Sequence, residues 1–486
     1  MSNASFSLPP MKNEPVLSYA PGSPERALLK AELERQASAP IEIPLIIGGK
    51  EVRTGKLRKV VCPHDHGHVL AHAHEAGEAE VQQAIQAALA ARKGWEATPW
   101  EERAAVFMRM ASLISTKYRY ILNAATMLGQ SKSPFQAEID STCETADFFR
   151  FNAAFMEDIY RRQPQSDPHM WNRLEYRPLE GFVLAVTPFN FTAIGANLAT
   201  APALMGNTVV WKPASTALLS NHHLMQLYKE AGLPDGVINF VPGSGSMIGR
   251  VCLEHRDFAG LHFTGSTGVF NSMWKTIAGS LERYRGYPRV VGETGGKDYI
   301  FMHASADAAQ TASALVRASF EYQGQKCSAC SRAYIPASRW EEVKGHIGAL
   351  MAEIRMGDVR DFRNFFNAVI DEAAFDSAMK YVELAKASPE AEILWGGKGD
   401  KTKGYFIEPT IIRTTNPSFI TMEEEIFAPV LTLFVYADDQ LDATLQLLDQ
   451  TSPYALTGAI FATDRHAIGH LTKALVNTAG NFYIND

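Results

Sequence analysis

The chain has 486 residues, with 46 Lys and Arg against 53 Asp and Glu, so its formal net charge is −7. Its composition, 46% hydrophobic and 20% charged, is that of a globular protein rather than a disordered one. The mildly acidic balance argues against nucleic acid or an anionic membrane as a partner, because both are densely negative. At ~150 residues per domain, the length suggests about three structural units.

The five cysteines are odd in number, and Cys62, Cys143 and Cys252 are widely scattered. They do not resemble a disulfide framework, so a reducing compartment is favoured. The N-terminus, MSNASFSLPPMKNEP, has no apolar segment of a secretory signal, and no arginine precedes Arg26, which argues against a mitochondrial transit peptide. We therefore expect a cytoplasmic protein, with the mitochondrial matrix as the alternative.

The first third of the chain is predicted to be mostly helical. Residues 1–24 are rich in Pro, Ser and Asn and are expected to form an irregular N-terminal arm. Residues 162–182 are polar and bounded by prolines, and the alternation in WNRLEYRP predicts an excursion or hairpin. Between these segments, helical patterns occur at residues 25–37, 78–94, 100–128 and 134–160.

A long uncharged run, residues 181–211, has the length of a membrane span. Pro188 and Pro202 interrupt it, and its β-branched residues cluster at the two ends. A buried strand–helix–strand unit fits this pattern better than a transmembrane helix.

From this run onward, short apolar strands alternate with helices. Strands are predicted at 182–186, 208–212, 237–241, 260–264 and 289–292, with helices at 192–205, 216–231, 246–254 and 267–281. A second series begins near Gly295, with strands at 298–302, 332–336, 406–413, 430–436 and 457–462 and helices at 306–322 and 338–355. This alternation is typical of parallel sheets and predicts two α/β domains that meet near residue 294, with a site in the cleft between them.

Three motifs lie where such strands end. GETGGK (292–297) places Glu293 before two glycines, which permit a tight turn, although a solvated turn acid is an equal reading. FTGSTG (263–268) closes a strand and opens a helix whose amides suit a phosphate, although an ordinary turn is the commoner case. VVWKPAS (209–215) ends a strand with Lys212, which is either near a cofactor ribose or a lysine that reaches out to solvent.

TPFNF (187–191) puts Asn190 in apolar surroundings, where its amide could donate to a developing oxyanion or cap the next helix. EYQGQKCSACSRAYIP (321–336) holds Cys327 and Cys330 in a C-x-x-C spacing. A structural zinc site needs four ligands, and no second pair exists except the distant HDHGH at 64–68. A thioredoxin-type redox pair would lie at a strand-to-helix turn, whereas this pair lies between a predicted helix and the strand predicted at 332–336. A single catalytic thiol is therefore the favoured interpretation, and no metal is expected.

The ordered set TPFNF, WKPAS, FTGS, GETGGK, GQKCSACSR and EEIFAPV (424–430) resembles the aldehyde dehydrogenase superfamily. NEPVLSYAPGSPER (13–26), FEYQGQKCSACSR and AGNFYIND (479–486) are most similar to the branch that oxidises L-glutamate γ-semialdehyde to L-glutamate in proline breakdown. The resemblance implies an α/β fold with a Rossmann-type parallel-sheet cofactor domain and an α/β catalytic domain. It implies an NAD-binding domain at 25–161 and 183–294, an oligomerisation hairpin at 162–182 and a catalytic domain at 295–486.

The resemblance also implies a mechanism. Cys327 attacks the aldehyde to give a thiohemiacetal, and the Asn190 amide and the Cys327 backbone N–H hold its oxyanion. After hydride transfer to NAD, Glu293 serves as general base for the water that hydrolyses the thioester. Cys330 is then a small buried residue.

The remaining site residues follow from the same resemblance. Ser328 and Glu144 are expected to face the substrate, with Glu144 near its ammonium group. The cofactor is expected to contact Thr187, Lys212, Gly265, Ser266, Thr267, Gly268, Val269, Glu425 and Phe427. A homodimer or higher homo-oligomer is expected.

Two features depart from the family pattern. Family members often have an acid at the position of Ser215, where it helps to exclude NADP, so the choice between NAD and NADP is open. The sequence ends at Asp486, where relatives continue with a Ser/Gly loop that binds the substrate carboxylate and a tail that pairs subunits, so a truncated catalytic domain is expected. Alternatives are another semialdehyde or aliphatic aldehyde dehydrogenase, a catalytically silent NAD-binding relative, and a thiol or zinc redox module.

Overall fold

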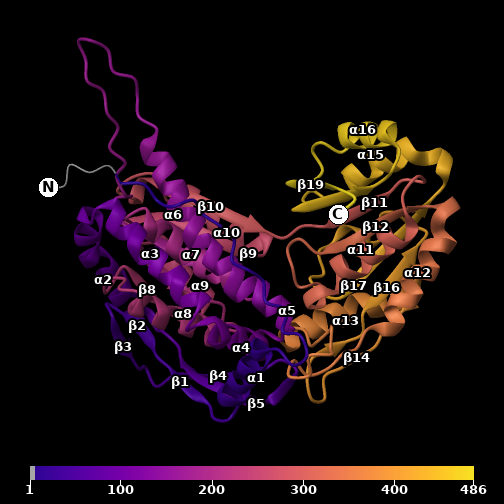
Figure 1. Ribbon diagram of the computed structural model, residues 1–486, viewed down its shortest axis with the longest axis horizontal. Coiled ribbons are helices and arrows are strands. Elements are labelled where there is room, and N and C mark those ends of the chain that lie inside the picture. Colours follow the sequence, from indigo (N-terminus) through magenta and orange to yellow (C-terminus); the bar gives the residue numbers. More distant parts are fainter. Residues whose placement is uncertain (1–5) are drawn as a thin grey trace. The chain divides into compact units, whose positions relative to one another are not determined.

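The computed structural model describes residues 6–486 and forms two compact units (Figure 1). Unit 1 holds the described residues up to Val61, together with Val69–Gln130 and Pro134–Glu293. Unit 2 holds Cys62–His68, Ser131–Ser133 and Thr294–Asp486. The expected N-terminal arm is irregular from residue 6 to the first helix, and its residues 1–5 lie outside the described part. The two short segments that belong to unit 2 were not anticipated from the sequence.

The core of unit 1 is a seven-stranded sheet in the order β10-β9-β6-β7-β8-β2-β3. Its central strands pair in parallel, whereas β2 runs antiparallel to β8. The uncharged run therefore forms strand β6, helix α7 and strand β7, as predicted. The strands are β2 (Leu45–Ile47), β3 (Lys50–Val52), β6 (Phe182–Val186), β7 (Thr208–Lys212), β8 (Ile238–Phe240), β9 (Phe258–Gly265) and β10 (Arg289–Thr294).

Helices cover this sheet, and a small second sheet in the order β1-β5-β4 accompanies it. Its strands, β1 (Ile41–Ile43), β4 (Leu57–Cys62) and β5 (Asp65–His74), were not predicted, nor was the β2–β3 hairpin. The helices are α1 (Pro24–Ala37), α2 (Glu78–Ala97), α3 (Trp100–Ser115), α4 (Arg119–Gln130), α5 (Pro134–Ala137), η1 (Glu138–Glu144), α6 (Thr145–Arg161), α7 (Thr192–Leu204), α8 (Leu218–Glu230), α9 (Gly245–Leu253), α10 (Thr267–Ala278) and η2 (Leu281–Arg283).

Two predicted helices are interrupted. The helix expected at 100–128 breaks after Ser115, where the hydroxyls of Ser115 and Thr116 bond back to the carbonyls of Ala111 and Ser112. Such side-chain bonds compete with the helical pattern and favour its end. The helix expected at 134–160 contains a π-helical turn, η1, which apolar periodicity does not reveal.

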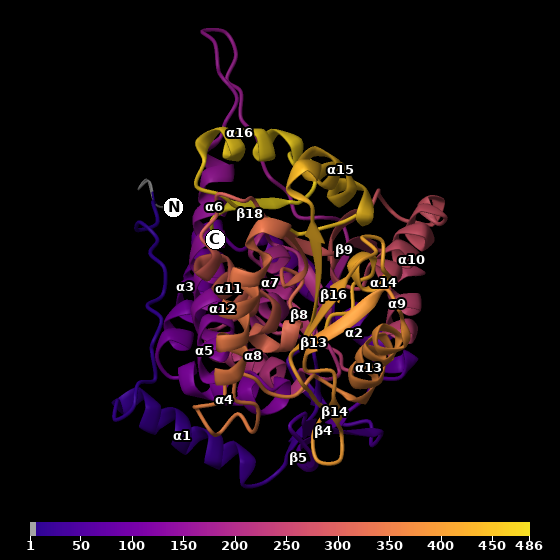
Figure 2. The same cartoon turned by 90° about the vertical axis from the view of Figure 1, so that its right-hand side faces the viewer.

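The predicted hairpin at 162–182 is an extension that projects from the end of α6 (Figures 1 and 2). It lacks a regular strand ladder, because Asp167 and Met170 form one isolated bridge and side chains make the other links across it. Trp171 in this extension is 96% exposed.

Unit 2 is built on a second seven-stranded sheet, in the order β13-β16-β17-β12-β11-β18-β19. The strands of this sheet pair in parallel, except that β13 is antiparallel to β16. The strands are β11 (Asp298–Met302), β12 (Cys330–Pro336), β13 (Ala391–Trp395), β16 (Thr410–Thr414), β17 (Val430–Tyr436), β18 (Thr457–Phe461) and β19 (Asn481–Ile484). The strand predicted at 406–413 splits at Pro409 into β15 (Phe406–Ile407) and β16, because proline cannot donate to a ladder, and β15 pairs with β14 (Gly399–Asp400).

The helices of unit 2 pack on this sheet, with α11 and α12 side by side (Figure 2). They are α11 (Ala308–Phe320), η3 (Glu321–Gly324), η4 (Ala337–Arg339), α12 (Trp340–Glu353), α13 (Glu372–Ala387), α14 (Ile420–Glu423), η5 (Asp438–Gln440), α15 (Leu441–Thr451) and α16 (Arg465–Ala474).

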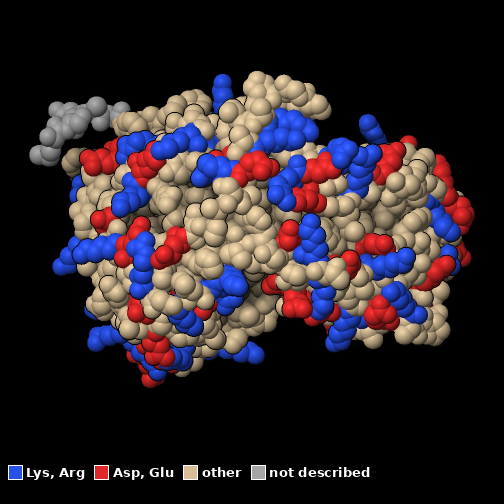
Figure 3. All heavy atoms as spheres, turned by 90° about the horizontal axis from the view of Figure 1, so that it is seen from below, with Lys and Arg blue, Asp and Glu red and all other residues tan. Residues whose placement is uncertain are grey.

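Charged side chains of both signs are interspersed over the face shown in Figure 3, which shows no extended basic patch. Among the described residues, every helix is too short or too polar to cross a bilayer.

Candidate functional site

The carboxyl ends of β6, β7 and β9 bring several predicted cofactor residues to one edge of the unit 1 sheet. Because these strands are parallel, Thr187, Lys212 and Gly265 follow or end them at the same edge. The Thr187 backbone N–H donates to the Lys212 carbonyl at 3.2 Å, and Trp211 Nε1 donates to Thr187 Oγ1 at 3.0 Å. The sheet therefore places Thr187 and Lys212 next to each other.

Lys212 lies beside Gly245, the first residue of α9. A Cβ atom at Gly245 would lie 3.7 Å from Lys212 Nζ, an ordinary van der Waals contact, so the Lys212 side chain packs against the start of α9. Burial lowers the pKa of Lys212, with a further contribution from Arg58. Gly245 was missed in the sequence, although PGSGS before a helix is a recognisable turn signal.

The start of α10 offers backbone amides to an anion. Ser266 precedes the helix in extended conformation, Thr267 begins it, and the first turn holds no acidic side chain. A Cβ atom at Gly268 would meet open space, whereas one at Gly265 would meet the Phe263 ring. With the positive end of the helix dipole and Lys212 on the same sheet edge, this part of unit 1 fits a phosphate-bearing dinucleotide. Val269 is exposed in the same turn.

The other predicted residues of unit 1 lie on three different elements. Asn190 is 3% exposed in the turn between β6 and α7. Glu144 is half-buried at the end of η1, and Glu293 is exposed on β10. A side chain at Gly292, the residue before Glu293, would overlap the ring of Phe270, so this position suits glycine.

In unit 2, Cys327 follows a backbone turn of unusual geometry. Tyr322, Gln323 and Gly324 have φ values of 51°, 56° and 66°, all in the left-handed region. Non-glycine residues in this region are strained and persist only where their surroundings hold them, commonly near functional sites. Gln323 Nε2 donates to the carbonyls of Ser131 and Ala368, and the Gln325 side chain accepts from Ile370 N at 2.9 Å.

The two cysteines of the C-x-x-C segment differ in environment. Cys327 is half-buried before β12, whereas Cys330 is the first residue of that strand and is 4% exposed. Burial raises the pKa of the Cys330 thiol to about 12. All five cysteines, which lie in the described residues, are thiols rather than disulfides. Cys327 is therefore the more accessible thiol of the pair. Ser328, next to it, is half-buried.

The histidines considered for zinc have other roles. His64 Nδ1 lies 3.2 Å from Ser131 Oγ, and His66 Nε2 lies 3.0 Å from the Lys401 carbonyl. Burial lowers the pKa of His64 to about 4. Within residues 6–486, no group of three or more His, Cys, Asp or Glu side chains is placed to hold a metal ion.

Glu425 and Phe427 lie in unit 2 beside the two glycines that follow Thr294 in the GETGGK motif, Gly295 and Gly296. Glu425 Oε1 accepts a hydrogen bond from Gly296 N at 3.2 Å, and a side chain at Gly295 would overlap the Glu425 carboxylate. Glu425, Phe427 and Cys330 line a small cavity of about 10 Å³. Gly295 therefore allows the Glu425 carboxylate to approach the backbone, whereas Gly296 allows close approach of the backbone at Tyr454 and Ala455.

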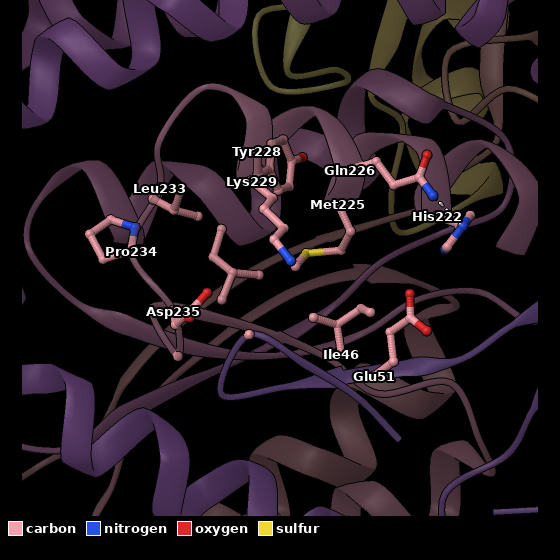
Figure 4. A pocket seen from close by; sticks show the side chains of 13 residues that line it. Ile46, Glu51, His222, Met225, Gln226, Tyr228, Lys229, Leu233, Pro234 and Asp235 are labelled. Carbon is pink, nitrogen blue, oxygen red and sulfur yellow. Dashed lines mark hydrogen bonds between the residues drawn. The ribbon is translucent and has the colours of Figure 1, made fainter. Parts of the chain in front are cut away.

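A larger cavity, of about 80 Å³, lies in unit 1 beside the β2–β3 hairpin and α8 (Figure 4). Glu51, His222, Lys229 and Asp235 are among its lining residues, and His222 is hydrogen-bonded to Gln226 at 2.9 Å. It lies toward the amino end of β8, because Gly49 and Gly236 also line it. None of the predicted site residues lines this cavity.

Comparison with known proteins places these residues in a family context. The profile of the aldehyde dehydrogenase family matches residues 51–486. A protein of Dictyostelium discoideum named delta-1-pyrroline-5-carboxylate dehydrogenase, mitochondrial, is 51% identical over 486 residues, which cover 99% of this chain and 87% of that protein. The human protein of the same name is 46% identical over 475 residues, covering 98% of this chain and 84% of its own.

A similar solved structure is the delta-pyrroline-5-carboxylate dehydrogenase of Mycobacterium tuberculosis bound with NAD. It superposes with a TM-score of 0.97 at 47% identity, and the match covers 100% of this chain and 90% of that one.

Proposed function

Because the chain belongs to the aldehyde dehydrogenase family, we propose that it oxidises L-glutamate γ-semialdehyde, the open form of 1-pyrroline-5-carboxylate, to L-glutamate with NAD. The observation that carries this proposal is the similarity to 1-pyrroline-5-carboxylate dehydrogenases along almost the whole chain. The half-buried thiol of Cys327, beside the buried Cys330, is consistent with it.

In the proposed reaction, the Cys327 thiolate adds to the aldehyde carbon and forms a thiohemiacetal. The Asn190 amide and the Cys327 backbone N–H donate to the oxygen that becomes negative, which lowers the barrier by electrostatic stabilisation. Bound NAD supplies the acceptor for the hydride, and loss of that hydride leaves a thioester on Cys327. Glu293 takes a proton from the hydrolytic water, and the thioester releases the carboxylic acid and restores the thiol.

We assign the substrate's polar groups to two residues. Ser328 lies next to the nucleophile and contacts the substrate, and the Glu144 carboxylate pairs with its ammonium group. Glu144 is half-buried, where an ion pair is screened less than at the surface.

We assign the cofactor contacts to residues of unit 1 and to residues beside the GETGGK turn. Lys212 would hold the adenine-side ribose and Thr187 would contact the cofactor. The start of α10 would hold the pyrophosphate through Gly265, Ser266, Thr267, Gly268 and Val269. Glu425 accepts from the nicotinamide ribose, and Phe427 packs beside it. The open space at Gly268 supports the assignments at the start of α10. Because Ser215 carries no negative charge, NADP binding should be measured beside NAD.

The proposal extends to domain roles and assembly. Residues 25–161 and 183–294 form the NAD-binding domain, 295–486 form the catalytic domain, and 162–182 connect subunits of a homo-oligomer. Met170, Trp171 and Leu174 are exposed in that extension, as expected of an interface. We place the protein in the cytoplasm, and the mitochondrial names of two relatives support the mitochondrial matrix as the alternative.

The test is NADH formation with L-glutamate γ-semialdehyde, compared with butyraldehyde and with a Cys327→Ala variant. Turnover that is selective for the semialdehyde and absent from the variant supports the proposal. Equal rates with butyraldehyde would favour a less selective aldehyde dehydrogenase. A folded protein that binds NAD but oxidises neither aldehyde would overturn the proposed activity and leave a silent relative.

A further inference from the structure

The turn that carries Asn190 is held by two side chains from outside it. Asn190 lies between β6 and α7. Its neighbour Phe189 accepts a hydrogen bond from Gln130, whereas Thr192 and Ala193 donate hydrogen bonds to Gln130 and Asp140. Both side chains are buried, at 1% and 0% exposed. The conformation of this turn therefore depends on residues that are 50 to 60 positions away in the sequence.

Gln130, the last residue of α4, bridges the turn on both sides of Asn190. Its Nε2 donates to the Phe189 carbonyl at 2.6 Å. Its Oε1 lies 3.0 Å from Thr192 Oγ1 and 2.9 Å from Ser220 Oγ, and both hydroxyls donate to it. One amide thus fixes the residue before Asn190 and the second residue after it.

Asp140 caps the helix that begins after Asn190. Its Oδ2 accepts from Thr192 N at 3.0 Å, and its Oδ1 accepts from Ala193 N at 2.8 Å. The preceding residue, Phe191, has no side chain that can cap α7. The carboxylate from a distant element therefore satisfies two helix-start amides and interacts favourably with the helix dipole.

The π-helical turn η1 supplies Asp140. Its extra residue per turn changes which side chains face α7, and such turns recur at functional sites. The other side of η1 is fixed, because Ser141 and Thr142 both donate to Asn123 Oδ1, at 2.7 and 2.8 Å. Asn123 Nδ2 in turn donates to Glu138 at 2.7 Å. Asp140 is therefore held rigidly at the start of α7.

We propose that Gln130 and Asp140 are positioning residues that orient the Asn190 amide for oxyanion stabilisation. The inference rests on the proposed function, since it assumes that Asn190 donates to the oxyanion. Neither residue belongs to the motifs that carry the family resemblance. An oxyanion donor works only if it is preorganised, because a misplaced donor must reorganise as the charge develops. Loss of either support should thus lower kcat more than it raises KM.

The test is a double-mutant cycle on the full chain, with kcat and KM for the semialdehyde and Kd for NAD. Asn190→Ala alone should lower kcat by about 10²-fold, as expected for loss of an oxyanion donor. Asp140→Asn and Gln130→Met should each lower kcat by roughly 10-fold, with KM and Kd changed less than about two-fold. In the Asn190→Ala background, each should lower kcat by less than about two-fold, because the amide they orient is absent.

Asp464→Asn is the control for loss of a helix cap in unit 2. Asp464 Oδ1 accepts from the N–H groups of His466 and Ala467 at the start of α16, where the carboxylate is exposed. This variant should leave kcat unchanged. Thermal midpoints of all variants identify any that do not fold. If Asp140→Asn does not fold, Gln130→Met still tests the inference independently.

Three outcomes would overturn the inference. The decreases in kcat caused by Asp140→Asn and Gln130→Met could be as large in the Asn190→Ala background as in the unmodified protein. That result would make both residues merely structural. Both variants could leave kcat unchanged while Asn190→Ala lowers it, which would leave the proposed function intact. Asn190→Ala could itself leave kcat unchanged, in which case the assigned role of Asn190 fails together with the inference.

Discussion

Gln323 Nε2 donates a 2.6 Å hydrogen bond to the carbonyl of Ala368, 45 residues further along the chain. The same nitrogen donates to the Ser131 carbonyl at 3.1 Å. The Gln323 side chain thus binds two backbone segments, at Ser131 and at Ala368. The backbone of Gln323 itself is left-handed, with φ 56°. Since Cys327, the proposed nucleophile, follows four residues later, this side-chain amide helps to hold the turn that precedes it.

Gln323→Ala should therefore weaken the turn and lower kcat by about 10-fold, because the left-handed backbone loses its support. Gln323→Gly is the matched variant, since glycine removes the same hydrogen bonds but tolerates the left-handed region. Thermal denaturation should place the alanine variant about 1 kcal/mol below the glycine variant. Equal stability of the two would contradict the role assigned to backbone strain.

Gly295→Ala should displace the Glu425 carboxylate, because the new methyl group would occupy its position. A carboxylate at the end of a flexible side chain can move away, so the protein should still fold. If Glu425 binds the nicotinamide ribose, the KM for NAD should rise about 10-fold, which is roughly 1.4 kcal/mol of lost binding. Gly345→Ala in α12, where a Cβ atom meets open space, is the control and should behave like the unmodified protein. An unchanged KM in Gly295→Ala would argue against the assigned contact.

Cys327 should react with iodoacetamide before the buried cysteines. Burial raises the pKa of Cys330 and of Cys62 to about 12, so at pH 8 both remain protonated and shielded. Mass spectrometry of peptides after brief labelling should find the modification on Cys327, in step with loss of activity. A Cys330→Ala variant should be inactivated at the same rate. Labelling of Cys330 at the rate of Cys327 would show that the segment opens in solution.

Much of the parallel-sheet framework could be predicted from the sequence, and the site geometry could not. Strands such as β6, β7, β11 and β17 have the predicted bounds, because buried parallel strands form continuous apolar runs between turn signals. The three-residue strands β1 to β3 carry too few residues for periodicity to detect.

The supports of the candidate site were missed for a different reason. Asp140 and Gln323 act through contacts with residues distant in sequence, and neither a π-helical turn nor a left-handed glutamine has a local sequence signal. Glu293, Asn190 and Cys327 were proposed because they lie in recognisable motifs, whereas Asp140 lies outside them. Gln323 lies in the motif that holds Cys327, but its left-handed backbone and its contacts with Ser131 and Ala368 could not be predicted from that motif. Candidate catalytic residues could therefore be proposed from the sequence, whereas the contacts that hold their surroundings were visible only in the fold.

His64 should make the protein less stable in acid. Burial lowers its pKa to about 4, against 6.5 when unfolded, so between these values the unfolded chain binds more protons than the folded one. The free energy of unfolding should therefore rise by about 3 kcal/mol between pH 4 and pH 6.5 because of this one side chain. Lowering the pH from 6.5 to 4 should remove the same amount of stability. Asp358 Oδ1, 3.7 Å from Nε2, opposes the shift, whereas Arg360 adds to it.

The measurement is chemical denaturation from pH 4 to 7 for the unmodified protein and for His64→Asn. The asparagine amide can still reach Ser131 Oγ, which now pairs with His64 Nδ1, but it does not titrate. Its profile should be flatter by about 3 kcal/mol over this window. Identical slopes for His64→Asn and the unmodified protein would mean that His64 is protonated in the folded state, and that the Ser131 contact does not hold a neutral imidazole.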